Sequence, residues 1–350
     1  MLCVLAGALL IGGISLSCFP APRFSAKENR YLAAFPQAEL SAVCDGSYTA
    51  AIDAYATERF PARNRLRQLG AVYQLALGQR ELGGVLLCRD GSLLRRITPN
   101  ERSFSKNLSA LCHWHQVYGE KLTVAAVPAA VMLRQAALPL FYDRSQDLGI
   151  LQAIRCACPD ALLFSELDGD ADWYRTDHHW TTAGAYRAYQ ALGSALGYTP
   201  LPENAFTKEV ASQSFYGTAH AATGSPFTRP DVITLYRFPQ ESDLSVRIDG
   251  KDAPFAGLYD FEKLQTQDGY GVFLGGNHAE MTITATASRP ALLVIKDSFA
   301  NALLPFLALH FDLTVVDPRY TKEELASYCS HAERILFLCG VQTLCETPFI

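Results

Sequence analysis

The residues that can do chemistry lie in two stretches more than a hundred positions apart. The first is Thr176–Trp180 (TDHHW), and the second is Lys296–Phe299 (KDSF), which directly follows the apolar run Ala291–Ile295. A serine hydroxyl becomes a strong nucleophile when an imidazole accepts its proton and a carboxylate orients that imidazole. One stretch supplies the aspartate and histidine and the other supplies the serine, so together they predict an acyl-transfer site.

Two adjacent histidines compete for the role of base. On an extended backbone, side chains at positions i and i+2 point the same way, whereas neighbouring side chains diverge. This geometry pairs Asp177 with His179 and leaves His178 as the alternative if the backbone is not extended. Thr181 or Thr182 can cap the helix predicted downstream. We therefore expect the Asp–His pair on a loop that enters a helix.

Ser298 follows an apolar run that is typical of a buried parallel strand. Sites of α/β proteins lie at the carboxyl edge of the sheet, and the start of a helix there offers free N–H groups and a positive dipole end to an oxyanion. Alternatively, Asp297 or Ser298 only caps the next helix, as these residue types often do. The apolar residues expected on the inner face of that helix are Leu303, Leu304, Leu307 and Phe311.

Short motifs spread along most of the chain match a known pattern. They are Glu28–Arg30 with Phe35–Pro36, Phe60–Arg63, Phe215–Thr218, Gly275–Asn277, Lys296–Asn301, Pro305–Leu307 and Asp317–Tyr320. With the tetrapeptide at 177–180, they make the chain resemble the DHHW family, which is named after that tetrapeptide. These proteins are similar to the SGNH-hydrolase-like alginate O-acetylation proteins. The resemblance implies Asp177 as the orienting acid, His179 as the base and Ser298 as the nucleophile.

The spacing does not identify the group that would stabilise the oxyanion. Our first choice is the turn at Gly276 and Asn277, where glycines let a backbone N–H and a side-chain amide approach one point. The same turn is explained equally well by a need for positive φ. Asn301, one helical turn after Ser298, is the second choice. Lys296 departs from the wider hydrolase pattern, which has a small residue at this position.

Composition and element order predict the fold. The 350 residues are 49% hydrophobic and 19% charged, which allows a substantial core, and a net charge of −5 without a basic run argues against nucleic-acid binding. Alternating strands and helices predict an α/β sandwich with a largely parallel sheet. This agrees with the SGNH-hydrolase-like three-layer sandwich that the resemblance implies. The predicted strands cover 85–88, 93–94, 122–127, 161–164, 291–295, 314–316 and 335–338, and a helical stretch over 48–80 is interrupted at Phe60–Pro61.

We divide the chain into three parts. Residues 1–22 form a transmembrane anchor or signal segment, 23–95 a helical extension that packs on the main domain, and 96–350 the SGNH-like domain, with an insertion at about 201–290. Residues 2–19 carry no charge and approach the roughly 20 residues that cross a bilayer. This predicts a cell-membrane protein whose main domain is extracellular or periplasmic. No lysine or arginine precedes the run, so its orientation is unsupported and the true start can lie upstream.

The ten cysteines show no metal-binding pattern. They are scattered without a Cys-x-x-Cys motif, so we expect core thiols and no metal or other cofactor. Cys329, Cys339 and Cys345 are the best place for a single disulfide. His113 and His115 have the spacing of metal ligands, but they lie in a predicted helix without a nearby third ligand, and we interpret them as structural.

These observations support two hypotheses. The first is an exported, membrane-tethered serine acyltransferase or esterase. The resemblance implies that it acts on a cell-envelope or extracellular polysaccharide, with a membrane-bound partner protein as acyl donor. Trp180 and His178 are expected beside the substrate, where Trp173, Tyr174 and Trp180 can stack on sugars, although such aromatics more often pack in the core. The alternative is a non-catalytic glycan-binding or envelope-assembly protein with the same fold.

Overall fold

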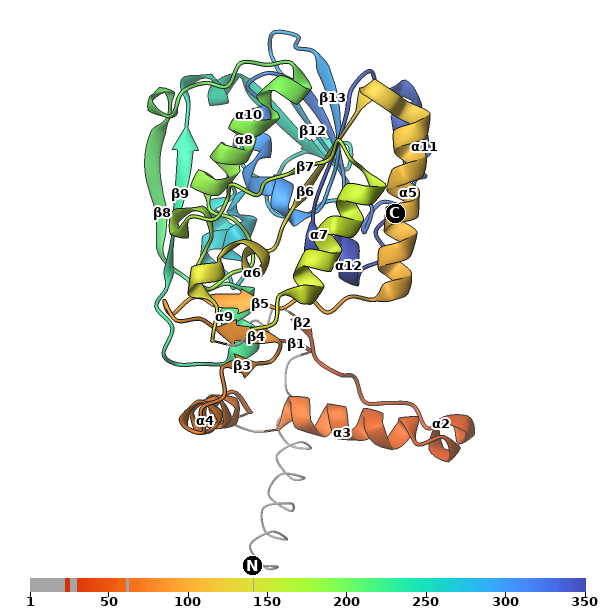
Figure 1. The fold of residues 1–350 in the computed structure, drawn as a ribbon, viewed down its shortest axis with the longest axis vertical. Helices are drawn as coiled ribbons and strands as arrows, with labels where there is room; N and C mark the ends of the chain where they lie inside the picture. The colour runs from red at the N-terminus through yellow and green to blue at the C-terminus, as the bar shows by residue number, and fades with distance from the viewer. Residues whose placement is uncertain (1–22, 26–29, 61–62, 141) are drawn as a thin grey trace, which may run out of the picture.

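An eight-stranded sheet forms the core of the molecule (Figure 1). The computed structural model describes residues 23–25, 30–60, 63–140 and 142–350. The strand order is β11-β10-β12-β14-β13-β15-β6-β7, in which β14, β13, β15, β6 and β7 are parallel and the other three strands antiparallel. The strands are β6 (Leu122–Val127), β7 (Leu162–Leu163), β10 (Leu244–Ile248), β11 (Lys251–Asp252), β12 (Glu280–Ala285), β13 (Ala291–Lys296), β14 (Asp312–Val316) and β15 (Ile335–Gly340).

The central strands are buried on both faces, which explains their continuous apolar sequences. Every residue of β15 is buried, as is every residue of β13 after Ala291. In register, Ile295 of β13 lies beside Val316 of β14 and Phe337 of β15. The carboxyl ends of these three strands therefore meet at one edge of the sheet, where the Lys296–Phe299 segment follows β13.

Helices cover both sides of the sheet in Figure 1, with α8 and α10 on one side and α5, α7 and α12 on the other. The helix α8 (Thr182–Leu196) begins where Thr181 accepts a hydrogen bond from the N–H of Gly184, as predicted, and ends at Gly197 with φ 73°. The remaining helices are α2 (Leu40–Cys44), α3 (Ser47–Arg59), α4 (Arg63–Ala76), α5 (Glu101–Tyr118), α6 (Ala130–Leu133), α7 (Ser145–Ala157), α9 (Thr218–Thr223), α10 (Leu304–Leu307), α11 (Leu325–His331) and α12 (Val341–Glu346).

Smaller sheets flank the core. A hairpin of β8 (Thr207–Phe215) and β9 (Asp231–Arg237) packs near α8, whereas β10, β11 and β12 extend the main sheet. The segment predicted as an insertion thus supplies one edge of the core sheet as well as a separate hairpin. The other short strands are β1 (Phe24–Ser25) paired with β2 (Arg30–Tyr31), and β3 (Glu81–Leu82), β4 (Val85–Leu87) and β5 (Leu93–Arg95) in a three-stranded sheet.

Several sequence predictions can be compared with this fold. All the predicted strands have counterparts, and the helical stretch breaks between Arg59 and Arg63, as expected from Phe60–Pro61. The eight cysteines within the described residues are free thiols, so the predicted disulfide is not formed. The predicted anchor at 2–19 lies outside the described residues. Among the residues that are described, no helix combines the length and apolar character that a membrane span requires.

Candidate active site

The histidine-bearing segment is a short loop closed at its base. Trp173 and Trp180 form an antiparallel bridge, and the residues between them follow a bent path. Within the bend, the Asp177 carboxylate accepts a hydrogen bond from the backbone N–H of His179 at 3.0 Å. This is the turn that aspartate commonly forms with the residue two positions on. The extended backbone expected from the sequence is therefore wrong, although Asp177 still pairs with His179.

A chain of hydrogen bonds joins the three predicted residues. Asp177 Oδ1 lies 2.6 Å from Nδ1 of His179, and Nε2 of the same ring lies 2.7 Å from Oγ of Ser298. The carboxylate can only accept, so Nδ1 carries the proton and Nε2 is free to accept the serine hydroxyl proton. Ser298 is partly exposed, whereas the other two residues are buried. The structure thus joins the three residues in the predicted order and leaves the serine partly exposed, and the catalytic roles remain a prediction.

Both carboxylate oxygens of Asp177 accept hydrogen bonds. Asp177 Oδ2 accepts hydrogen bonds from the backbone N–H of Thr218 at 2.7 Å and from its hydroxyl at 3.0 Å. Burial alone would raise the pKa of Asp177, but the electrostatic effect of the neighbouring imidazoles and the hydrogen bonds from His179 and Thr218 outweigh it, so the pKa is lowered. A Cβ on Gly217 would lie 2.2 Å from Asp177 Oδ2. Only glycine allows the Phe215–Thr218 motif to approach so closely.

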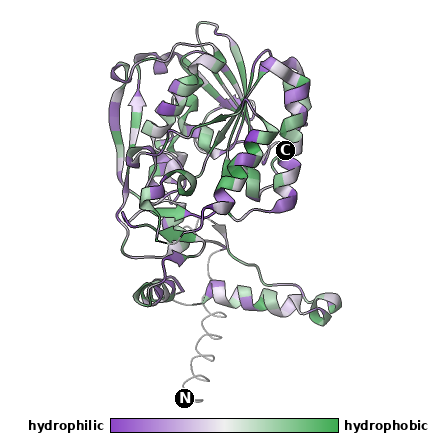
Figure 2. Cartoon of the chain, viewed as in Figure 1, coloured by the Kyte–Doolittle hydropathy of each residue, from purple (hydrophilic) through white to green (hydrophobic). Residues whose placement is uncertain are grey.

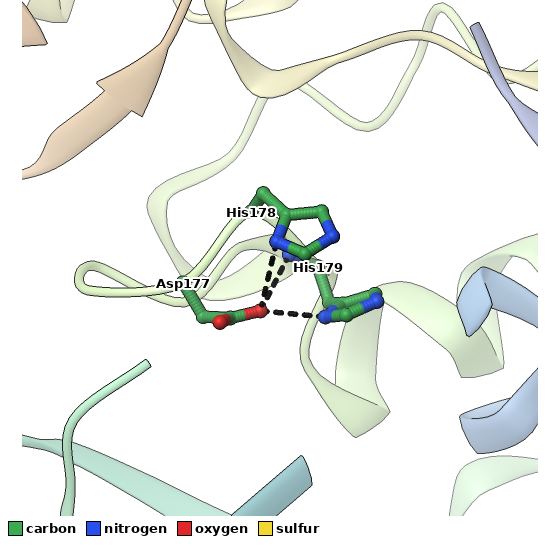
Figure 3. Close-up of side chains that lie close together, drawn as sticks. All are labelled: Asp177, His178 and His179. Carbon is green, nitrogen blue, oxygen red and sulfur yellow. Dashed lines mark hydrogen bonds and ion pairs between the residues drawn. The ribbon is translucent and has the colours of Figure 1, made fainter. Parts of the chain in front are cut away.

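The second histidine is part of the same cluster but does not bind the serine. Figure 3 shows both imidazoles on the same side of Asp177, with His178 Nδ1 3.6 Å from Asp177 Oδ1. His178 Nδ1 also lies 2.7 Å from Oγ1 of Thr218. Burial, then the electrostatic effect of His179, lowers the pKa of His178 to about 3, so this ring is neutral at neutral pH. The geometry favours His179 as the base and leaves His178, with 26% of its side chain exposed, facing the site.

The nucleophile segment is fixed by Asp297. Its Oδ1 accepts from the N–H of Phe299, and its Oδ2 accepts from the N–H of Gly340 and the hydroxyl of Thr343. Asp297 therefore caps the 3-10 helix η8 (Ser298–Ala302) and ties the end of β13 to that of β15. The Ser298 hydroxyl is left free to bond His179.

The predicted helix after Ser298 is wrong in length. Only η8 and the four-residue α10 form, and Phe311 lies beyond both. Pro305 lies in the first turn of α10 and has no N–H, so it cannot donate the hydrogen bond that would join the two helices. So short a turn provides little dipole, and the argument from a helix N-terminus no longer holds. The backbone N–H of Ser298 itself has no hydrogen-bond acceptor among the described residues.

Trp180 connects the two halves of the site. Its indole N–H donates to the carbonyl of Phe299 at 2.9 Å, and the Phe299 ring packs edge-on against the rings of Trp180 and His179. Trp180 is completely buried, and Trp173 and Tyr174 are nearly so. The three aromatics thus pack in the core, which the sequence analysis gave as their more common role, and the expected contact of Trp180 with substrate is wrong because its side chain is enclosed. Trp180 instead holds the histidine loop against the serine segment.

Three residues near the site carried no signal in the sequence analysis. The Tyr270 ring stacks on the His179 ring, with centroids 3.9 Å apart and planes within 5°. Asp231 accepts hydrogen bonds from the backbone N–H groups of Arg175 and Thr176, which anchors the loop before Asp177. Burial raises the pKa of Asp268, although nearby Lys263 and His179 oppose this. Tyr270, Asp231 and Asp268 all come from the segment between 201 and 290, where no local motif marked them.

The three residues predicted to stabilise the oxyanion, Gly276, Asn277 and Asn301, differ in whether they keep a free hydrogen-bond donor. Gly275 and Gly276 have φ of 74° and 98°, but the N–H of Gly276 donates to the carbonyl of Phe273, so the choice of Gly276 as a donor is wrong. Asn301 uses its amide oxygen to accept from Lys296 and its NH2 group to donate to Asn277. Asn277 Oδ1 accepts from both neighbours, whereas its NH2 group has no acceptor among the described residues. Of the two amides, Asn277 is therefore the one whose NH2 group stays available to an oxyanion.

The cluster of Asp177, His178 and His179 also contains potential metal ligands, since one ligand atom from each lies within 4.8 Å of the others. However, the 2.6 Å separation of Asp177 Oδ1 and His179 Nδ1 is a hydrogen bond. Two ligands that bind one ion at about 2 Å in tetrahedral geometry stand roughly 3.3 Å apart. The arrangement therefore suits proton transfer better than metal binding.

Comparison with known proteins agrees with the resemblance found in the sequence. The model of the family described as DHHW protein matches residues 161–316, which include all three residues of the hydrogen-bonded chain. No curated protein matches the sequence. A DHHW family protein from Eubacterium siraeum has a similar structure, with a TM-score of 0.62 and 21% identity over 76% of this chain and 93% of that one.

Two further structures are similar. Bacillus cereus PatB1 with a sulfonyl adduct has a TM-score of 0.60 and 19% identity, covering 76% of this chain and 98% of that one. The O-acetyltransferase domain of Pseudomonas putida AlgJ has a TM-score of 0.46 and 16% identity, covering 75% and 92%. At these identities, the similarity to the Eubacterium siraeum protein and to PatB1 concerns the fold. That fold is a mixed α/β domain with a large, mostly parallel sheet. The predicted resemblance is confirmed, and residues 161–316 carry the DHHW family pattern.

Proposed function

We propose that this protein is a serine acyltransferase or esterase that moves O-acetyl groups onto or off a polysaccharide. The observation that carries the proposal is the continuous hydrogen-bonded chain from Asp177 through His179 to the partly exposed Ser298. The chain has the order and atoms that nucleophilic catalysis by serine requires. Its position at the carboxyl edge of a parallel sheet is also where α/β proteins place their active sites.

The reaction follows from these atoms. Ser298 Oγ attacks the acyl carbonyl while His179 Nε2 takes its proton, and Asp177 stabilises the resulting imidazolium. The Ser298 N–H and the amide of Asn277 would donate to the oxyanion. When the tetrahedral intermediate collapses, the C–O bond to the leaving alcohol breaks and that alcohol takes the proton from His179. Water or a sugar hydroxyl then attacks the acyl-serine, with His179 again as the base.

The polysaccharide and the cellular setting rest on the DHHW resemblance and on residues 2–19. The uncharged N-terminal run supports an exported, membrane-tethered protein with its main domain outside the membrane. A glycan acceptor in the cell envelope or outside the cell suits that setting, as does a membrane-bound partner that supplies the acyl group. The sulfonyl adduct of PatB1 supports the use of a sulfonyl probe here, because the two folds are similar.

The test compares purified full-length protein with Ser298→Ala, using p-nitrophenyl acetate as the acyl donor. We expect the wild type to hydrolyse it, Ser298→Ala to lose this activity without losing thermal stability, and a Ser242→Ala control to behave as wild type, since Ser242 is exposed on a distant turn. If wild type and Ser298→Ala are equally inert towards several donors while the protein retains glycan, the non-catalytic alternative is correct.

Transfer and hydrolysis differ only in the group that accepts the acyl chain. Supplying an oligosaccharide acceptor together with the donor separates them. Acylated sugar detected by mass spectrometry identifies a transferase, whereas release of free acetate at an unchanged rate identifies an esterase.

A further inference from the structure

The lysine that precedes the nucleophile segment is buried without contact with solvent. Lys296 is the last residue of β13 and has 0% exposure, as does Asp317, which follows the parallel neighbour β14. Their side chains form an ion pair at 3.7 Å, and both oxygens of Asp317 also accept hydrogen bonds from Arg319. Burying an ammonium group is unfavourable, and a small or apolar side chain could occupy the strand end without that penalty. The lysine therefore needs an explanation.

The ammonium group controls the orientation of two amides. Lys296 Nζ lies 3.0 Å from Oδ1 of Asn277 and 2.7 Å from Oδ1 of Asn301. An ammonium can only donate, so both amides must turn their oxygens towards it and their NH2 groups away. The NH2 group of Asn301 then donates to Asn277 Oδ1, which saturates that oxygen. Of the two amides, only Asn277 keeps an NH2 group without an acceptor among the described residues.

We propose that Lys296 is a positioning residue, whose buried ammonium group holds Asn277 with its oxygen inward so that the amide NH2 is presented to the oxyanion formed at Ser298. This inference rests on the proposed acyl-transfer function. It also explains why a charged residue stands where the wider hydrolase pattern has a small one. Lys296 does not touch the substrate in this account, and it acts only through Asn277.

A double-mutant cycle with p-nitrophenyl acetate tests the proposal. Lys296→Met and Asn277→Ala should each lower kcat about 10²- to 10³-fold, the loss typical of one oxyanion donor, while KM changes less than about threefold. The double variant should be no more than about threefold worse than either single variant, because both remove the same donor. The inference would be overturned if the double variant lost kcat by the product of the two single losses. It would also be overturned if Lys296→Met kept the wild-type kcat. Lys251→Met, on the exposed strand β11, is the control and should keep wild-type activity.

The pH profile provides a second measurement. Burial lowers the pKa of Lys296 to about 8, although Asp317 and Asp297 oppose this and Arg319 reinforces it. His278 also feels the charge of the lysine, but its own pKa is lowered, mainly by burial, so it is already neutral in this range. Above pH about 8 the neutral amine gains a lone pair and no longer forces the amide oxygens inward. We expect wild-type kcat to fall there, and Asp317→Asn to move the fall to lower pH. A fall that persists unchanged in Lys296→Met would contradict the assignment.

A structural readout separates this inference from the proposed function. An inactive wild type would overturn the function itself, before any lysine variant is made. In that case a crystal structure of Lys296→Met still decides the inference. An Asn277 amide that has turned or moved supports it, and an amide that keeps its place overturns it.

Discussion

Two helices of similar length show how differently the chain uses its helical segments. The 13-residue α3 (Ser47–Arg59) has no buried residue, whereas nine of the 15 residues of α8 (Thr182–Leu196) are buried. Figure 1 shows α3 lying apart from the main body, and Figure 2 shows hydrophobic and hydrophilic residues mixed along it. Both segments have a helical sequence pattern. Only α8 has an apolar face, and that face packs against the domain that holds the site.

The comparison teaches where the structure can tolerate change. The three hydrogen-bonded residues Asp177, His179 and Ser298 lie at the edge of the sheet, immediately before α8 or after β13. The N-terminal helices instead leave large apolar side chains such as Leu69 and Tyr73 two-thirds exposed. Substitutions should therefore have large effects at the sheet edge and small ones in the N-terminal helices.

The largest effect is expected at the orienting carboxylate. Asp177→Asn keeps the size of the side chain but cannot hold Nδ1–H of His179, so the ring loses the tautomer that accepts the serine proton. Removing this role in serine hydrolases lowers kcat about 10⁴-fold, and we expect a loss of 10³- to 10⁴-fold. Steady-state kinetics with p-nitrophenyl acetate measures it. A loss below tenfold would show that Asp177 does not orient the base.

A pair of leucine truncations tests the difference in packing. Leu192→Ala in α8 removes a side chain with 0% exposure and should lower the free energy of unfolding by about 2–5 kcal/mol. Leu69→Ala in α4 removes a side chain that is 66% exposed and should change it by less than about 0.5 kcal/mol. Urea unfolding followed by circular dichroism measures both. Equal losses would show that the N-terminal helices are packed against a surface.

Two glycine-to-alanine substitutions, each of which adds a single methyl group, test the same difference in packing. Gly217→Ala would place a Cβ 2.2 Å from Asp177 Oδ2, so the motif must move away from the carboxylate. We expect a destabilisation of about 1–3 kcal/mol and a loss of activity. Gly70→Ala in α4 meets nothing within 4 Å and should stabilise its helix by up to about 1 kcal/mol. Thermal unfolding compares the two, and a stable, active Gly217→Ala variant would contradict the account of the Asp177 pocket.

The sequence predicted what depends on local pattern. Continuous apolar runs marked β13 and β15, and the threonines at 181 and 182 marked the start of α8. Residue types and spacing, together with the DHHW resemblance, selected Asp177, His179 and Ser298. The pairing of Asp177 with His179 was predicted for the wrong reason, because a turn and not an extended backbone brings them together. The helix after Ser298 was predicted too long, because its apolar residues continue past the point where Pro305 interrupts the hydrogen bonding.

The rest of the site could not be predicted from local pattern, because its contacts join residues far apart in the chain. Gly217 and Asp231 hold the histidine loop from about 40 and 55 positions away, and Tyr270 stacks on His179 from about 90. Lys296 stood out in the sequence as an unusual residue. Its role needed the positions of Asn277 and Asp317, which only the folded sheet edge supplies.

The most direct test of the central claim is covalent labelling with phenylmethylsulfonyl fluoride, followed by intact-mass and peptide mass spectrometry. The account predicts one sulfonyl adduct on Ser298, labelling at least about 100-fold slower in His179→Ala, and a rate within about tenfold of wild type in His178→Ala, because only His179 accepts the serine proton. A wild type that is not labelled, or a Ser298→Ala variant labelled as fast as the wild type, would contradict it.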